Sequence, residues 1–183
     1  DPDAGWRLPP DVAIDLLTSP YAGADAVTLR RLRRAVRRPA LDAGVAAPAD
    51  VLLATALARP GDLADVGAEG SGARGIARML DAATRAIDHA GGRAPAEDVL
   101  WAIWQASGVA DRWREAALAG GAAGVRADRD LDAVIALLGA AGDFADRLPG
   151  SSALAFVDHL SAQDVAADRI VARGADRDRV AVL

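Results

Sequence analysis

Apolar residues recur every three or four positions along most of the chain, the spacing that places them on one face of an α-helix. The clearest example runs from Ile76 to Ile87. On the opposite side of this predicted helix, Asp81 and Arg85 are four residues apart and can form an ion pair. The apolar face consists of Ile76, Met79, Leu80, Ala83 and Ile87. The segment therefore predicts an amphipathic helix that turns one face towards a core.

Prolines and glycines divide the rest of the chain into further predicted helices, since both residues commonly mark helix ends. Two segments are predicted to be loops: residues 39–48, rich in Ala and Pro, and residues 61–72, which are Gly-rich and expected to be mobile. The last helix is expected to be capped by Ser151 or Ser152. It runs through Leu154, Val157 and Leu160. The other predicted helices span residues 11–19, 26–38, 50–58, 97–107 and 125–147, with a further short helix around Trp113.

Residues 97–113, EDVLWAIWQASGVADRW, hold three of the four tryptophans. Gly108 separates two predicted helices, so the segment is expected to form a helical hairpin. Because each tryptophan can bury about 150–250 Å², we expect this hairpin to anchor a single hydrophobic core. The inner face of the long helix is predicted to comprise Leu131, Val134, Ile135, Leu138 and Ala141. The expected core comprises Leu80, Ile87, Trp101, Ile103, Trp104, Leu131, Val134 and Leu138.

The chain as a whole is predicted to be all-α, a single domain over residues 1–183 built as an irregular bundle of about seven or eight helices. Residues 178–183, DRVAVL, have instead the composition of a short strand. An unpaired strand edge is unfavourable, and the sequence offers no second strand. We therefore expect its sheet to belong to a neighbouring domain. The first residue, Asp1, and the single methionine, Met79, favour a fragment of a longer protein.

The composition narrows the classes of protein and site. Cysteine is absent, which excludes disulfides and thiolate metal sites and is typical of a cytoplasmic protein. No apolar run reaches the length of about 18 residues needed to span a membrane, so no membrane partner is expected. All 21 basic residues are arginine. The net charge of −5 gives no overall attraction to nucleic acid, although a local basic face can still bind it.

A cluster of arginines in the second predicted helix is the one binding signal in the sequence. Asp25 is a suitable N-cap for the helix predicted over residues 26–38. Leu29, Leu32 and Val36 fall on one side of that helix, which directs the arginines to the other side. The candidate DNA-binding residues are Arg30, Arg31, Arg33, Arg34, Arg37 and Arg38. One interpretation of this cluster is a surface that contacts DNA phosphates. The alternative interpretation is a solvent-exposed face whose charge is balanced by nearby aspartates.

No catalytic, cofactor-binding or metal site is predicted. Residues 70–75 fit G-x-G-x-x-G, but a dinucleotide-binding turn requires a preceding strand and a βαβ unit that this sequence does not predict. A flexible start to the following helix is the favoured interpretation. Without lysine, the chain contains neither a Walker A loop nor the lysine of PD-(D/E)xK nucleases. His89 and His159 are far apart in sequence and indicate no zinc site, while His89 suits a helix C-terminus.

Four blocks of sequence, in one order, carry a family resemblance. They are LLTSP-x-x-G-A-D-x-x-x-L-R-R-L-R-R at Leu16–Arg34, the tryptophan hairpin LW-x-x-W with ADRWREAALAGG, ADRDLDAV at Ala127–Val134, and AFVDHLSAQ at Ala155–Gln163. Together they resemble the region around the helical 2B insertion of UvrD/Rep/RecB-like DNA helicases of superfamily 1. The resemblance is to actinobacterial members, including helicase–nucleases of the AdnA/AdnB kind.

The resemblance implies a helical accessory domain of an ATP-dependent 3′–5′ DNA helicase or translocase that acts in repair and recombination. ATP and Mg²⁺ would then bind RecA-like domains outside this chain, and the strand at 178–183 would belong to one of them. The implied partners are duplex DNA or a single-strand/duplex junction, the other helicase domains and, in helicase–nucleases, a second subunit. The implied location is the cytoplasm, in association with the nucleoid. The alternative is a stand-alone helical DNA-binding regulator or a protein-interaction bundle.

Overall fold

The computed structural model describes residues 7–64 and 66–163. In this part of the chain eight segments are α-helical, two short 3₁₀ turns occur, and no residue lies in a strand. The predicted all-α fold is therefore confirmed, while the predicted strand at 178–183 lies outside the described residues. The elements are α1 (Pro10–Thr18), α2 (Ala26–Asp42), α3 (Ala49–Ala58), η1 (Pro60–Leu63), η2 (Ala68–Gly70), α4 (Ser71–His89), α5 (Ala96–Ser107), α6 (Ala110–Ala119), α7 (Gly121–Arg147) and a helical segment at 153–163.

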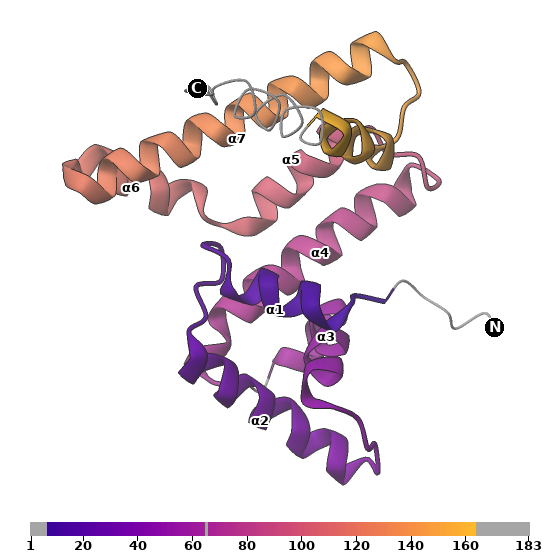
Figure 1. Ribbon diagram of the computed structural model, residues 1–183, viewed down its shortest axis with the longest axis vertical. Coiled ribbons are helices and arrows are strands. Elements are labelled where there is room, and N and C mark those ends of the chain that lie inside the picture. The colour runs from indigo at the N-terminus through magenta and orange to yellow at the C-terminus, as the bar shows by residue number, and fades with distance from the viewer. Residues whose placement is uncertain (1–6, 65, 164–183) are drawn as a thin grey trace, which may run out of the picture.

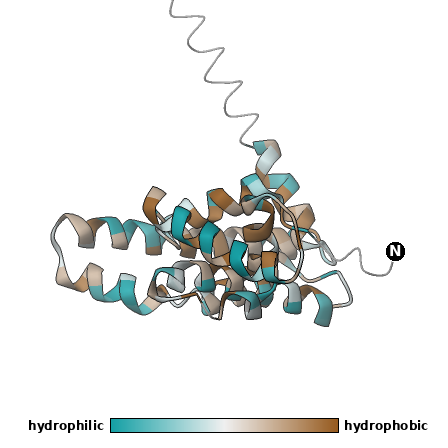
Figure 2. Ribbon diagram, turned by 90° about the horizontal axis from the view of Figure 1, so that it is seen from below, coloured by the Kyte–Doolittle hydropathy of each residue, from teal (hydrophilic) through white to brown (hydrophobic). Residues whose placement is uncertain are grey.

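Helix α4 is the element that joins the two halves of the described chain (Figure 1). Helices α1 and α2 each pack on α3, and α1 and α3 contact α4. The chain then turns at Gly91 and Gly92, both with positive φ, and α5 returns along α4. Helices α6 and α7 form an antiparallel pair, and α7 also packs on α5. Apolar and polar residues are interspersed along most of these helices (Figure 2), as the periodicity of the sequence predicts.

Two separate hydrophobic clusters take the place of the single predicted core. The larger lies among α1, α2, α3 and the first half of α4, and its completely enclosed side chains are aliphatic. The smaller joins α5, α7 and the helical segment at 153–163 through Phe144 and Phe156, whose ring centroids lie 5.4 Å apart. The largest side chains with almost no exposure are Leu17, Leu32, Leu53, Leu57, Leu63 and Ile76. The tryptophan hairpin therefore does not anchor the main core.

Of the predicted core residues, Leu80 packs against the larger cluster, and Ile103, Trp104, Val134 and Leu138 line a small pocket with Tyr21 and Met79. Trp101 is 50% exposed, which contradicts its assignment to the core. The remaining members are half-buried: Leu80, Ile87, Ile103, Trp104, Leu131, Val134 and Leu138. The physical reason is that α5 packs on α4 and on α7 with its other sides, and the exposure of Trp101 indicates that no described element covers the side that carries it.

The inner faces of the last two helical segments also differ from the prediction. On α7, Ala141 is completely buried as predicted, but Ile135 is 67% exposed. Phe144, one turn beyond Ala141, supplies the apolar contact instead. On the segment at 153–163, Leu154 and Val157 are exposed, and Phe156 is the buried residue. A stripe of aliphatic residues in the sequence does not show which segment packs against it. Here the contact between Phe144 and Phe156 determines which face of each helix turns inwards.

Both predicted loops are more ordered than expected. Helix α2 continues through Pro39 to Asp42, although a proline inside a helix removes one backbone N–H donor and crowds the carbonyl four residues earlier. Residues 61–64 and 66–72 contain 3₁₀ turns and the start of α4 rather than a mobile loop, and Leu63 and Val66 are buried there. Helix α7 likewise begins at Gly121 rather than near residue 125. A prediction from local composition therefore made helices α2 and α7 too short.

Local predictions of helix ends and pairs are confirmed. Arg85 and Asp81 form an ion pair of 2.7 Å on α4. Gly108 ends α5 with a φ of 63°, in the left-handed region that glycine tolerates. The Ser152 hydroxyl accepts a hydrogen bond of 3.3 Å from the Ala155 N–H at the start of the last segment. In the described part of the chain, no helix combines the length and apolar character needed to cross a membrane.

Candidate nucleic-acid interface

The arginine-bearing helix α2 is fixed at its start by a side-chain cap. The Asp25 carboxylate accepts a hydrogen bond of 2.7 Å from the Thr28 N–H, as predicted. The hydrogen bonds from Thr28 lower the pKa of Asp25 below its ordinary value, because they favour the ionised form. The cap satisfies one of the N–H groups that every helix leaves unpaired in its first turn. It thereby sets the residue at which α2 begins and hence the direction of each arginine.

Three aliphatic residues hold α2 against the larger cluster. Leu29, Leu32 and Val36 have exposed fractions of 8%, 0% and 9%, so the predicted inner face is confirmed. Five of the six candidate arginines are exposed on the remaining sides of the helix: Arg30, Arg31, Arg34, Arg37 and Arg38. The structure therefore brings these five guanidinium groups together on one solvent-facing surface, which we call the arginine face.

The sixth candidate, Arg33, is directed elsewhere. Its Nε donates to Oδ1 of Asp50 at 2.5 Å, and its Nη2 donates to Oδ2 at 3.2 Å. The hydrogen bond with Asp50 raises the pKa of Arg33, which stays charged. Arg33 lies nearest to the buried stripe around the helix circumference, so it can reach α3. The prediction directs Arg33 outwards with the other arginines; its side chain keeps 36% exposure but pairs with Asp50 of α3.

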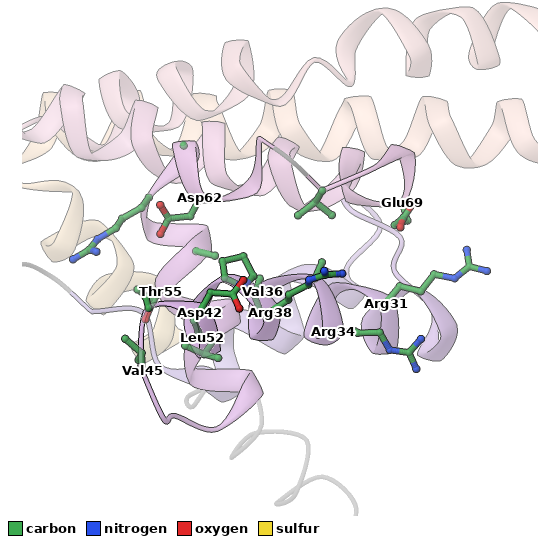
Figure 3. Close-up of a pocket in the computed structure, with 18 residues that line it drawn as sticks. Arg31, Arg34, Val36, Arg38, Asp42, Val45, Leu52, Thr55, Asp62 and Glu69 are labelled. Atoms are coloured by element: carbon green, nitrogen blue, oxygen red, sulfur yellow. The ribbon is translucent and has the colours of Figure 1, made fainter.

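A groove of about 1090 Å³ runs beside the arginine face (Figure 3). Arg31, Arg34 and Arg38 lie along its α2 side. Asp62 and Glu69, in the segment between α3 and α4, belong to its other side. Sequence analysis missed these two acids because they lie in a Gly-rich stretch whose packing no local pattern reveals. The groove therefore carries both signs of charge, in contrast to the outer surface at Arg30 and Arg37.

The G-x-G-x-x-G stretch has a packing explanation. A Cβ atom added at Gly72 would lie 2.4 Å from the Ala22 carbonyl oxygen, and one added at Gly70 would lie 2.6 Å from the Val66 side chain. Both glycines thus permit close approach of neighbouring segments. A 3₁₀ turn, not a strand, precedes α4. Residues 70–75 are therefore the start of α4, packed closely against Ala22 and Val66. The sequence predicted a flexible helix start here instead.

The two histidines make different contacts. His89 is in the last turn of α4, the predicted position near a helix C-terminus. Its Nδ1 lies 2.6 Å from the Arg85 carbonyl oxygen. His159 packs on Phe144 with ring centroids 5.1 Å apart. Among the described residues, no group of three or more His, Cys, Asp or Glu side chains has an arrangement suited to a metal ion.

An aromatic cluster joins two rings of the predicted tryptophan hairpin to Tyr21, which sequence analysis did not connect with it. Trp113 of α6 lies between Tyr21 and Trp104, with ring centroid distances of 5.7 Å and 6.0 Å. Burial, and then the charge of Asp130, raise the pKa of the Tyr21 phenol. The three rings connect the turn after α1 with α5 and α6. Only proximity in space could have identified Tyr21, since it stands alone in a turn of the sequence.

Comparison with known proteins adds no relative: no family model, curated protein or solved structure matches the chain.

Proposed function

We propose that this chain is a helical accessory domain, similar to the 2B insertion of superfamily 1 DNA helicases, and that it contacts the DNA backbone through the arginine face of α2. The single observation that carries the DNA contact is the exposure of Arg30, Arg31, Arg34, Arg37 and Arg38 on one firmly anchored helix. The sequence blocks that resemble such helicases support the assignment to a parent enzyme.

The size of the arginine face suits a short stretch of DNA backbone. From Arg30 to Arg38 the helix rises about 12 Å, which corresponds to about three or four phosphates along one strand. Guanidinium groups pair well with phosphates in a two-point geometry. Phosphates are the same at every base pair, so these contacts give affinity and orientation without sequence specificity. This is the behaviour required of a domain that guides a moving helicase.

The proposal assigns ATP hydrolysis to other domains of the parent protein. ATP and Mg²⁺ would bind there, and this domain would contribute DNA contacts, contacts to neighbouring domains or to a second subunit, and regulation. The bacterial reading frame that encodes the chain tests this parentage. A Walker A sequence upstream and a T-x-H-x-x-K-G-L-E-like stretch downstream are expected. A reading frame without them favours the alternative, a stand-alone DNA-binding regulator.

Duplex binding by variants of the chain tests the DNA contact. Replacing Arg30, Arg34 and Arg37 by Ala should weaken binding. It should also lower the slope of log affinity against log salt by about one for each arginine that no longer pairs with a phosphate. The matched control replaces Arg112, Arg126 and Arg129, which are exposed on α6 and α7, and changes the net charge equally. Fluorescence anisotropy at low and moderate salt gives both quantities. Equal affinities for wild type and the α2 variant would remove the DNA role from this helix.

A further inference from the structure

The side of α5 that carries Trp101 continues onto α7. The two helices run in opposite directions (Figure 1), and a Cβ atom added at Gly142 of α7 would lie 3.4 Å from Oε2 of Glu97 on α5. Trp101 is one turn after Glu97, and Ile135 is two turns before Gly142. Because the helices are antiparallel, both steps lead the same way from this contact. They place Trp101 and Ile135 on one side of the helix pair.

Water reaches the apolar residues on this side. Trp101 is 50% exposed and Ile135 is 67% exposed. Gly139, one turn after Ile135, is also exposed, and a Cβ atom added there would meet nothing within 4 Å. We call the surface formed by these three residues the Trp101 face. Exposed apolar residues that lie together commonly mark interaction sites, and tryptophan is among the residues that contribute most to binding energy.

Carboxylates surround the Trp101 face. Helix α5 contains two acidic residues in its first turn and no basic residue. On α7, aspartates occur three and seven residues before Ile135 and eleven residues after it, intervals that return to nearly the same side of a helix. Arg126, nine residues before Ile135, falls on the opposite side. The exposed carboxylates are those of Glu97, Asp98, Asp128, Asp132 and Asp146.

These charges are available to a binding partner. Within residues 7–64 and 66–163, none of the five carboxylates forms an ion pair. They are spread around two helices, and the described part of the chain contains no group of acidic residues suited to a metal ion. The negative potential attracts basic side chains and repels the phosphates of a nucleic acid. The Trp101 face is therefore the chemical opposite of the arginine face of α2.

We propose that the Trp101 face is the docking site for a basic segment of another protein. An apolar side chain of that segment packs against Ile135 and Gly139, and arginine or lysine side chains face the surrounding carboxylates. A cation placed over the indole ring of Trp101 adds a further attraction. Burial of the apolar surface gives most of the affinity, and the charges select a basic partner. The inference is independent of the proposed contact with DNA, which uses α2.

A labelled model peptide tests the proposal with the whole chain. The probe is a helical peptide of about 15 residues, with leucines along one edge and arginines on both sides of that edge. A second probe has glutamate in place of each arginine. Fluorescence anisotropy should show saturable binding of the basic probe and binding of the acidic probe that is at least about tenfold weaker. Absence of saturable binding, or equal affinity for the two probes, would overturn the proposal.

Trp101→Ala locates the site on the molecule. This substitution should weaken binding of the basic probe about tenfold or more, as expected for a tryptophan at the centre of an interface. The matched control is Leu118→Ala on α6, since Leu118 is 82% exposed, and it should leave binding unchanged. Circular dichroism establishes that both variants are folded. Unchanged binding by Trp101→Ala would place the probe elsewhere and refute the proposal.

Neutralising the surrounding carboxylates tests the choice of a basic partner. Glu97→Gln with Asp132→Asn should weaken binding of the basic probe about threefold or more. Asp11→Asn with Asp15→Asn, at exposed positions of α1, changes the net charge equally and should have no effect. If the two double variants weaken binding to the same extent, the probe responds only to the net charge of −5, and the proposed site is wrong.

Duplex DNA and a second copy of the chain are the competing occupants, since the arginine face of another copy is also basic. Trp101→Ala should leave duplex binding unchanged, and sedimentation of the wild type should give the same mass as that variant at every concentration. Weaker duplex binding by Trp101→Ala would make this face part of a nucleic-acid interface. Self-association that Trp101→Ala abolishes would assign the face to a second copy. Either result would contradict the proposal.

Discussion

The guanidinium of Arg33 and the carboxylate of Asp50 form a two-point ion pair between α2 and α3, with distances of 2.5 Å and 3.2 Å. This pair removes one arginine from the six that lie close together in the sequence. It also fixes the position of α2 relative to α3, the two helices that flank the groove. Which arginines remain for the proposed DNA contact is therefore decided by a pairing that only the folded structure reveals.

We predict that this ion pair contributes modestly to stability. Both side chains are more than a third exposed, so solvent screens their attraction. A double-mutant cycle with Arg33→Ala and Asp50→Ala should give a coupling of about 0.2–1 kcal/mol in the free energy of unfolding. Urea denaturation measures it. A coupling well above about 2 kcal/mol would indicate that the pair is shielded from water, contrary to its exposure.

The cap of α2 predicts a dependence of stability on pH. The pKa of Asp25 in the folded protein is lowered below its ordinary value of 3.8 by hydrogen bonds from Thr28. The stabilisation is therefore fully present above pH 3.8, and it is lost as the pH falls through the lower folded-state pKa.

Asp25→Asn isolates this effect, because asparagine keeps the cap and does not titrate. The difference in the free energy of unfolding between wild type and this variant should stay constant above about pH 5 and decrease below about pH 4. All other carboxylates are common to the two proteins and cancel. A difference that is independent of pH would mean that the cap does not favour the ionised form.

The glycines in the first turns of α4 predict opposite effects of alanine. At Gly72 a Cβ atom would meet the Ala22 carbonyl oxygen at 2.4 Å, so Gly72→Ala should destabilise the protein by about 1–3 kcal/mol. At Gly75 the nearest atom is 3.9 Å away. Gly75→Ala should therefore stabilise it by up to about 1 kcal/mol through helix propensity. Thermal denaturation of the two variants is the test, and a stable Gly72→Ala protein would contradict the close approach.

The sequence predicted what depends on neighbours along the chain. Helix identity, the Asp25 cap, the Gly108 end and the inner face of α2 follow from periodicity and short-range hydrogen bonds. Packing between distant segments did not follow, because an apolar stripe does not specify what covers it. Trp101 is the clearest case, since its size favours burial but no described helix lies over it. The acidic side of the groove, at Asp62 and Glu69, was missed for the same reason.

The position of the smaller core predicts which aromatic residue the C-terminal half depends on. Phe144 is 4% exposed and packs on Phe156, whereas Trp101 is 50% exposed. Phe144→Ala should therefore cost about 3–5 kcal/mol. Trp101→Ala removes a larger side chain but should cost only about 1 kcal/mol, because much of its surface already contacts water. Urea denaturation followed by circular dichroism gives both values on one scale. If Trp101→Ala proved the more destabilising, the tryptophan hairpin rather than the Phe144–Phe156 pair would hold this half together.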